Sequence, residues 1–403
     1  MIYFFIFLYL FFAGSYFYKF PHSKYYSINK VFVFCLFVCI AGLRYNLGVD
    51  YFVYVKKYRN AKSLIDIISG ESLKESVEDG LEIGFEIYQI ILKTVTDNPQ
   101  LIFFISSIIS TILLFKALKY FEHRQFFFFA LLTYFCAIYI IMEMQALRQA
   151  LAAGFIYCGL ACRNSSFKRS SLWILIACLF HNSAFLFLVL LPIINQRIAL
   201  KFQLIVLSIS LLIFIFHITW LTSVISFLSL IIPDLAVVER VMNYLTSEGL
   251  MIQRGFYLTF LLYLLVYLLN LYHYRKLGYY SKSSKQIIAQ NLLWMYLIVS
   301  CLTWEIAFFS VRFGWYFLFG LVVCLPNIIS FFKKSSKYLA ISYIFIFNFL
   351  LVRPFIFPSI TQLPFSPYQD YISCELFGVK STGKQRAEQY MSEMGLTVNF
   401  EEL

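Results

Sequence analysis

Four arginines adjoin hydrophobic segments directly, and their side chains have the chemistry of an anion-binding site. They are Arg44, Arg148, Arg254 and Arg312. A guanidinium group stays charged and presents a planar fork of donors that matches phosphate oxygens. One such arginine alone is usually an interfacial residue whose head group extends to the lipid surface. Four of them at equivalent helix ends favour another interpretation, in which several cations face one cavity and hold a diphosphate.

Arg148 gives the most specific indication. It lies in "MEMQALRQALAAGFIYCGL", at the start of a segment with the composition of a helix. A cation at a helix N-terminus opposes the macrodipole, unless an anion is held there jointly by the side chain and the free backbone amides. We therefore expect Arg148 to contact an anionic substrate group. Small residues that follow it permit close helix contact; they are Ala150, Ala152, Ala153 and Gly154.

Two residues are candidates for a general base. His181 interrupts the apolar run "SLWILIACLFHNSAFLFLVLLPI", and an ionisable group within such a run is a functional candidate. Its neutral form suits proton abstraction near pH 7; a buried ring bonded to a backbone carbonyl is the structural alternative. Asp50 follows Arg44 by six residues in "RYNLGVDYFVY", where Asn46 and Gly48 predict a turn that brings the two charges together.

The same stretch allows simpler interpretations. An exposed salt bridge between Arg44 and Asp50 would be worth under about 1 kcal/mol. Tyr51 and Tyr54 could belong to an aromatic belt at the membrane interface, or they could form surfaces on which a sugar stacks. The local sequence does not separate these alternatives.

Several chemical signatures are absent from the sequence. It contains no P-loop, no Rossmann glycine pattern, no HExxH and no GxSxG. Its nine cysteines show neither metal-ligand spacing nor a CxxC pair, and no DxD pair or acidic cluster in a helix marks a divalent cation. We therefore expect a metal-independent mechanism without a cofactor.

The composition assigns these residues to a membrane protein. Of 403 residues, 61% are apolar and only 13% are charged, whereas soluble domains carry about 25% charged residues. The apolar runs are long enough to cross a hydrocarbon core about 30 Å thick. They are about 1–18, 27–43, 100–115, 126–142, 145–162, 171–194, 202–219, 254–272, 287–310, 313–330 and 338–352. We predict an all-α polytopic membrane protein with about 11–12 transmembrane segments.

Basic residues predict the orientation. The excess of 33 Lys+Arg over 21 Asp+Glu is a topology signal in such a chain, and no nucleic-acid partner is expected. Compact basic loops at 19–30, 116–124, 163–169, 275–285 and 333–337 are placed in the cytoplasm. Residues 44–99, 143–148, 220–253 and 311–312 and the tail then face outwards.

The number of apolar runs does not agree with the predicted orientation of the basic loops. Three runs separate the basic loops at 163–169 and 275–285, and an odd number of crossings cannot return to the same side. The run 171–194 has His181-Asn182-Ser183 at its centre, which favours a broken, re-entrant hairpin of two half-helices. An additional crossing through residues 221–233 is the alternative.

The predicted organisation is a membrane domain, 1–352, followed by a polar C-terminal tail, 353–403. Two long extracytoplasmic loops, 44–99 and 220–253, belong to the membrane domain. Within the first loop, "GFEIYQIILKTV" has the spacing of an amphipathic helix on the membrane surface. The first 20 residues lack a positive n-region, and we expect them to be retained as a helix.

Three ordered segments resemble the EpsG family, which groups with the Wzy-type polymerases of bacterial O-antigen and exopolysaccharide. They are "RYNLGVDYFVY", "LRQALAAGFIY" and "SLWILIACLFHNSAFLFLVLLP", and a late "PYQDY" is similar to a Pro-Tyr element near such C-termini. The resemblance covers roughly residues 30–370.

The resemblance implies an enzyme with a GT-C-like membrane glycosyltransferase architecture, in the bacterial inner membrane with a periplasmic active face. Such a polymerase transfers a growing glycan from undecaprenyl diphosphate to a repeat unit linked to undecaprenyl diphosphate. A chain-length regulator and a flippase are the implied partners. Arg148, Arg254 and Arg312 would hold the diphosphate, His181 or Asp50 would act as base, and Arg44 and Gln149 would orient the substrate.

Two other functions remain open from the sequence. An O-antigen ligase-like glycosyltransferase would use the same donor but deliver the glycan to lipid A core. A lipid-linked oligosaccharide flippase is the alternative of a different class, and the absence of a visible internal repeat counts against it.

Overall fold

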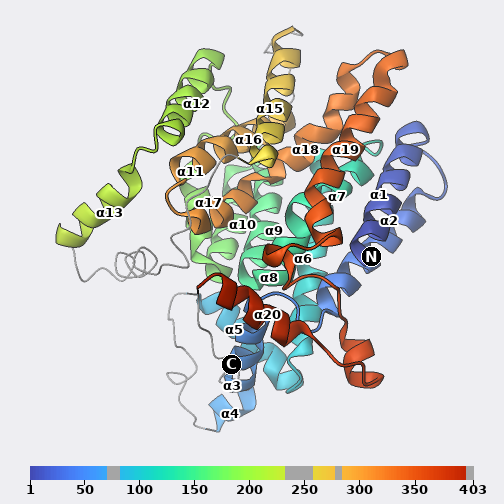
Figure 1. Cartoon of the computed structure of the whole chain (residues 1–403), viewed down its shortest axis with the longest axis vertical. Coiled ribbons are helices and arrows are strands. Elements are labelled where there is room, and N and C mark those ends of the chain that lie inside the picture. The colour runs from blue at the N-terminus through green and yellow to red at the C-terminus, as the bar shows by residue number, and fades with distance from the viewer. Residues whose placement is uncertain (70–81, 232–256, 277–283, 396–403) are drawn as a thin grey trace. The chain divides into compact units, whose positions relative to one another are not determined.

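The computed structural model describes residues 1–69, 82–231, 257–276 and 284–395. In these ranges the chain is built from helices, with one isolated β-bridge and no strand, so the all-α prediction is confirmed (Figure 1). The predicted Arg254 and the loop segments 70–81 and 232–253 lie outside the described residues. The chain divides into two compact units: unit 1 comprises Met1–Ile193 and Ser335–Glu393, and unit 2 comprises Ile194–Lys334.

Most of the residues that the sequence predicted for the site lie in unit 1. Its α-helices are α1 (Ile2–Lys19), α2 (Tyr26–Gly42), α3 (Asp50–Asn60), α4 (Leu64–Ile68), α5 (Ile83–Val95), α6 (Gln100–Phe121), α7 (Phe127–Tyr134), α8 (Ile140–Gln145), α9 (Leu147–Cys162), α10 (Phe167–Phe180), α11 (Phe185–Leu190), α19 (Lys337–Ile356) and α20 (Gly383–Glu393). A π-helical stretch, Phe135–Tyr139, joins α7 to α8.

Unit 2 contains the remaining described helices. They are α12 (Leu200–Ile215), α13 (Trp220–Ile231), α15 (Leu258–Lys276), α16 (Ser284–Leu302), α17 (Ala307–Phe317) and α18 (Phe319–Asn327). The residues predicted as an alternative crossing largely form α13, which is bent by 86° from α12. Glu305 caps the start of α13: its carboxylate accepts hydrogen bonds from the backbone amides of Leu221 at 2.7 Å and Thr222 at 2.9 Å.

Several helices are long and apolar enough to cross a membrane. Within the described residues there are 5, or up to 7 if each of two bent pairs is one span, and α2, α9 and α15 are shorter apolar helices. The longest, α6, has 22 residues and therefore rises about 33 Å. The polytopic class is confirmed, whereas length and composition alone identify fewer spans than the predicted 11–12, because several apolar runs are interrupted.

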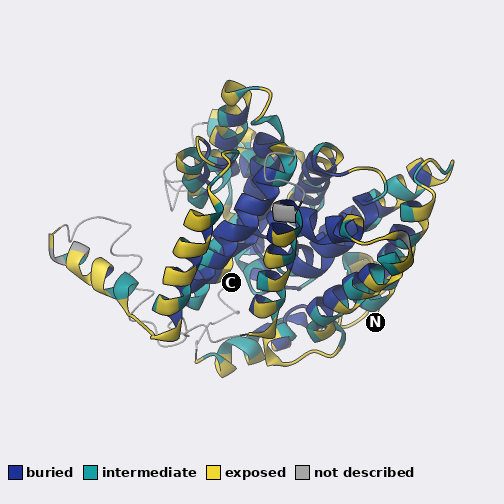
Figure 2. Ribbon diagram, turned by 90° about the horizontal axis from the view of Figure 1, so that it is seen from above, coloured by how far each residue is buried: buried dark blue, intermediate teal, exposed yellow. Residues whose placement is uncertain are grey.

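Burial follows the pattern of a helical membrane protein. Buried residues line helix faces that pack on other helices, and many exposed residues are apolar (Figure 2). On α10 and α11 the exposed side chains include Leu172, Leu175 and Phe185, with exposed fractions of 59%, 50% and 61%. The small residues of α9 act as predicted: a Cβ added at Gly154 would lie 3.0 Å from Leu113 of α6.

Basic segments gather at one end of unit 1. The Arg124 guanidinium lies 4.3 Å from the centre of the Tyr26 ring, and Asn164 Nδ2 donates to Tyr120 Oη at 3.2 Å. Lys337 lies 5.5 Å from the Tyr18 ring. The loops that follow α1, α6 and α9 and the start of α19 therefore share one end, as their common basic character predicts.

The run predicted to be broken is interrupted at His181. Helix α10 ends at Phe180, and His181 is extended with φ −157° and ψ 122°. After a short 3-10 turn, α11 leads back, because Arg163, which precedes α10, donates from Nε to the carbonyl of Leu191 at 2.7 Å. The break is thus confirmed, and α10 and α11 form a hairpin with His181 at its tip.

Two segments distant in sequence meet at the other end of unit 1. Tyr45 N donates to Gln369 O at 3.0 Å, and Tyr371 N donates to Leu43 O at 2.7 Å, which pairs Arg44 with Asp370 as an antiparallel bridge. Helices α3, α4, α5 and α20 lie at this end (Figure 1). The segment predicted as a polar tail is therefore folded against the first long loop.

Helix α5 has the two faces expected of an amphipathic helix. Ile83, Ile87, Ile91 and Val95 form an exposed stripe, whereas Phe85 is 3% exposed. The buried face packs against α6 and α10. This arrangement fixes the start of α5 beside the tip of the α10–α11 hairpin.

Candidate functional site

A carboxylate, an imidazole and a guanidinium meet in unit 1. Glu82 Oε1 lies 2.6 Å from His181 Nδ1 and accepts a hydrogen bond from the backbone amide of Asn182 at 3.3 Å. The second carboxylate oxygen, Oε2, forms an ion pair with Nη1 of Arg148. We call Glu82, His181 and Arg148 the charged cluster.

Each member of the charged cluster lies where a helix begins or breaks. Glu82 directly precedes α5, Arg148 is the second residue of α9, and His181 occupies the break between α10 and α11. Helix ends carry backbone groups without an intrahelical partner, and one of these, the amide of Asn182, binds Glu82. The break in the hairpin therefore supplies both a side chain and a backbone donor.

Gly84 permits the close approach of α5 and α10. A Cβ at this position would lie 2.6 Å from Leu179 Cβ and 2.8 Å from the Leu179 carbonyl oxygen. Any larger residue would have to push the two helices apart. The absence of a Cβ at Gly84 thus allows Glu82 to lie within hydrogen-bonding distance of His181.

Electrostatics keep Glu82 ionised. Burial alone would raise the pKa of this carboxyl, but the hydrogen bond to His181 and the charge of Arg148 lower it, and the pKa falls below its usual value. An ionised carboxylate only accepts hydrogen bonds. In the neutral ring of His181 the proton therefore lies on Nδ1 and the lone pair on Nε2, the arrangement that a general base requires.

The side chains of Arg148 and His181 remain partly accessible. The side chain of Arg148 is 29% exposed and that of His181 is 25% exposed, whereas that of Glu82 is 10% exposed. Arg148 Nε makes no hydrogen bond within the described ranges. The imidazole, oriented by the buried carboxylate, can deprotonate a hydroxyl, and the partly exposed guanidinium beside it can bind an anionic leaving group.

Tyr54 supports the cluster from α3. Its hydroxyl accepts a hydrogen bond from the backbone amide of Arg148 at 3.4 Å, and its ring packs edge-on against Phe85 at 5.9 Å. The side chain is 4% exposed. Tyr54 is therefore placed to position Arg148, not to present an open stacking surface.

Arg44 lies in a different environment. It is 0% exposed, donates from Nη1 to the Ala41 carbonyl at 2.6 Å, and stacks its guanidinium 4.5 Å from the centre of the Phe103 ring. Its Nε and Nη2 make no hydrogen bond within the described part of the chain. Arg44 holds the end of α2 against α6 and does not face solvent.

The other residues that the sequence predicted for the site lie in several different environments. Gln149 is 1% exposed, and Tyr51 is 4% exposed and stacks on Phe103 at 4.5 Å. Asp50 is the first residue of α3 and is electrostatically coupled to Tyr54 and to Tyr390 of α20. Arg312 belongs to unit 2, where its guanidinium lies 5.1 Å from the rings of Phe308 and Trp315.

Glu82 is the site residue that the sequence analysis did not single out. It is one of six acidic residues between positions 71 and 86, and nothing in its neighbours distinguishes it from the others. Within the described residues, no group of three or more His, Cys, Asp or Glu side chains could hold a metal ion.

Comparison with known proteins places this geometry in context. The family model described as EpsG family matches residues 27–370, which is most of the chain. The match spans α2 through the segment at Asp370 and includes every member of the charged cluster. No curated protein and no solved structure matches the chain.

Proposed function

Because the chain belongs to the EpsG family and is thus a polysaccharide polymerase-like membrane protein, we propose that it polymerises a lipid-linked glycan. In this proposal it transfers a growing glycan from undecaprenyl diphosphate to a repeat unit that is itself linked to undecaprenyl diphosphate. The observation that carries the proposal is the charged cluster, in which His181 Nδ1 lies 2.6 Å from Glu82 and Arg148 is ion-paired to the same carboxylate.

His181 acts as the general base. Its Nε2 takes the proton from an acceptor hydroxyl as the hydroxyl oxygen bonds to the anomeric carbon of the donor. The bond from that carbon to the diphosphate oxygen breaks, and its electron pair leaves with the diphosphate. Glu82 keeps the ring oriented and stabilises the imidazolium that forms, which is the role a carboxylate plays beside other catalytic histidines.

Arg148 stabilises the departing diphosphate. A preorganised cation is most effective where charge develops during the reaction, and the partly exposed guanidinium of Arg148 is such a cation. The assignment of Arg254 and Arg312 to the same diphosphate stays a prediction from the sequence. Gln149 and Arg44 orient the substrate indirectly, since both side chains are buried.

The location of the cluster supports an extracytoplasmic reaction. Basic loops share one end of unit 1, and such loops remain in the cytoplasm. Helix α10 begins at Phe167, within the basic segment 163–169, and reaches His181 only at its far end. The charged cluster then faces the periplasm, where a flippase would deliver the lipid-linked repeat unit.

The test is the banding of surface polysaccharide from a strain that lacks the gene. Restoring the wild-type gene should restore a ladder, whereas Arg148→Ala should leave core plus one repeat. Arg169→Ala is the matched control, because Arg169 is an exposed arginine at the start of α10. The amount of each protein in the membrane is measured in parallel.

Three results in the deletion strain would contradict the proposal, and one result in the variant would contradict the role of Arg148. An unchanged ladder in the deletion strain would exclude a polymerase. Loss of every attached repeat, including the first, would instead indicate ligation, and precursor trapped on the cytoplasmic side would indicate a flippase. A normal ladder with Arg148→Ala would remove Arg148 from the site.

A further inference from the structure

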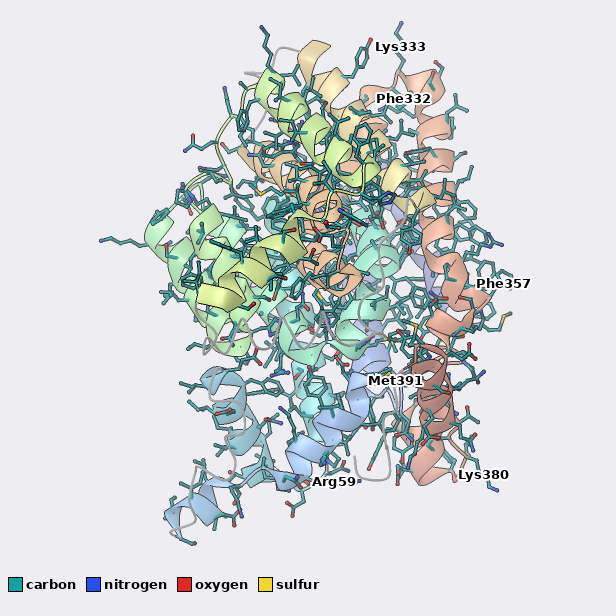
Figure 3. All side chains as sticks on the ribbon, turned by 60° about the vertical axis from the view of Figure 1, so that its left-hand side comes forward. Arg59, Phe332, Lys333, Phe357, Lys380 and Met391 are labelled. Carbon is teal, nitrogen blue, oxygen red and sulfur yellow. The ribbon has the colours of Figure 1, made fainter. Side chains whose placement is uncertain are left out.

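A polar cavity of about 380 Å³ lies in unit 1 beside α3. Its walls come from the loop that follows α2, from α3, from the turn before α6, and from the C-terminal segment that pairs with Leu43–Tyr45. Arg59 on α3 and Met391 on α20 lie at the same end of unit 1 (Figure 3). The volume falls within the range of roughly 300–1,000 Å³ that is typical of small-molecule sites.

The wall combines aromatic rings with hydrogen-bonding groups. The rings of Tyr45, Tyr371 and Phe52 line the cavity. The amide of Asn98 and the carboxylate of Glu375 lie among them. Two cations, Arg59 and Lys384, also line the cavity.

Contacts between these groups hold the cavity in shape. Asn98 Nδ2 donates to Tyr371 Oη at 2.7 Å, and Tyr45 Oη donates to a carboxylate oxygen of Glu375. Burial and the bond to Glu375 raise the pKa of Tyr45 to about 12, so its hydroxyl stays protonated at neutral pH. Each bond joins the first long loop, which ends in the turn before α6, to the C-terminal segment.

The position of α20 depends on two buried contacts. Arg386 donates to the carbonyls of Leu363 and Pro367, both at 3.0 Å. A Cβ at Gly383 would lie 2.0 Å from the carbonyl oxygen of Asn46, so only glycine allows α20 to start here. Lys384 is thereby brought to the cavity, and the C-terminal segment becomes one of its walls.

This lining matches a carbohydrate more closely than a lipid or an inorganic anion. A sugar ring has C–H faces that pack on aromatic rings and a rim of hydroxyls that need both donors and acceptors. Asn98, Glu375 and Lys384 offer donors and acceptors around aromatic walls. A lipid chain would leave these polar groups unsatisfied, and a lone anion would face the carboxylate.

We propose that this cavity is a glycan subsite, which binds a sugar residue of the substrate at a distance from the reacting atoms. The inference rests on the proposed function insofar as it names the sugar as part of the polymerase substrate. Helix α3 connects the two places: Tyr51 lines the cavity, and Tyr54, one turn later, bonds to the backbone of Arg148. The subsite and the contact to Arg148 thus lie one turn apart on the same helix.

The experiment measures binding to the purified full-length protein in lipid nanodiscs. The probe is the repeat-unit oligosaccharide released from the surface polysaccharide of the producing strain, and its Kd is measured by calorimetry. Asn98→Ala and Tyr371→Ala should each weaken binding by about tenfold, the ratio that corresponds to about 1.4 kcal/mol. Asn98 is exposed, but its Oδ1 also accepts a hydrogen bond from Gln100 N at 2.9 Å at the start of α6, so the midpoint of thermal unfolding of each variant is measured alongside.

Controls separate the subsite from the reaction site and from folding. Lys380→Ala, an exposed change on the same segment that does not line the cavity, should bind as wild type. His181→Gln should bind the fragment normally but lose chain extension. In a chain-extension assay the Asn98→Ala protein should show a raised KM with kcat retained, a split that a general loss of structure would not produce.

These experiments distinguish a failure of the glycan-subsite proposal from a failure of the polymerase proposal. Wild-type affinity in both Asn98→Ala and Tyr371→Ala would overturn the subsite, whatever the ladder shows. Failure of the wild-type protein to bind the fragment would overturn it as well. An unchanged ladder in the deletion strain would remove the polymerase, while fragment binding sensitive to Asn98 would still establish a glycan site.

Discussion

Arg44 and Arg148 adjoin apolar helices at the same end of unit 1 but lie in opposite environments. Arg44 is 0% exposed, bonds a backbone carbonyl and stacks on Phe103. Arg148 has a side chain that is 29% exposed and shares the carboxylate of Glu82 with His181. The first arginine organises the fold, and the second is available to a ligand.

The difference shows why residue type and helix position are an incomplete guide to function. Both guanidiniums are permanently charged, so both need compensation. Arg44 obtains it from a carbonyl and an aromatic face, whereas Arg148 obtains it from an ion that also orients a base. A partly exposed guanidinium can reach a substrate, whereas a fully buried one cannot, and the variants below test this distinction.

The largest effect is expected on chain extension with His181→Gln. Removing a general base lowers the rate by roughly 10²–10⁴, and the thermal midpoint should stay close to that of wild type because His181 is partly exposed. Turnover of lipid-linked repeat units by the purified protein measures the effect. His123→Gln, at an exposed histidine, serves as the control and should retain wild-type turnover.

Arg44→Ala should instead reduce the amount of folded protein. Loss of a fully buried side chain that packs on Phe103 costs about 2–4 kcal/mol, so the midpoint of thermal unfolding in detergent should fall. Activity per folded molecule should decrease far less than in Arg148→Ala. If Arg44→Ala unfolds at the wild-type temperature and yet abolishes chain extension, the contrast drawn between Arg44 and Arg148 is wrong.

Gly84→Val tests how closely the cluster must be held. The new side chain collides with Leu179 and should move Glu82 away from His181, and a displacement of about 1 Å can cost up to about 10²-fold in rate. Ile87→Val, on the exposed face of the same helix, is the control. Equal turnover in both variants would show that the contact between Glu82 and His181 is dispensable.

The smallest effect is a pH dependence of stability. The pKa of Glu82 is lowered in the folded protein, so its contribution is present above the ordinary carboxyl pKa and disappears as the pH falls through the folded value. Wild type should therefore unfold at a higher temperature than Glu82→Gln at pH 7, and the difference should shrink below about pH 4. Melting curves at a series of pH values measure this, and a constant difference would contradict an ionised Glu82.

Much of the fold could be predicted because it follows from local chemistry. The length of the apolar run at 100–115 predicts a spanning helix, and α6 is one. His181-Asn182-Ser183 within an apolar run predicts the break, since polar groups cannot remain without partners in hydrocarbon. The amphipathic spacing of "GFEIYQIILKTV" likewise predicts α5.

The candidate site could be predicted only in part. Arg148 and His181 are conspicuous because each is a polar residue in an apolar context, whereas Glu82 lies in a loop where acidic residues are common. Glu82 precedes Arg148 by 66 residues and His181 by 99. No local pattern encodes a contact over such separations.

The sequence by itself determined that this chain is a polytopic helical membrane protein, that its apolar run 171–194 breaks at His181, and which ionisable residues its apolar segments carry. These properties follow from hydrophobic transfer and backbone hydrogen bonding, which act within one segment. Tertiary structure alone decided that Glu82 orients His181, that Arg44 is buried while Arg148 is open, and that the C-terminal segment completes a cavity beside α3. Those outcomes depend on the packing of distant helices, where single atoms such as the missing Cβ of Gly84 set the distance.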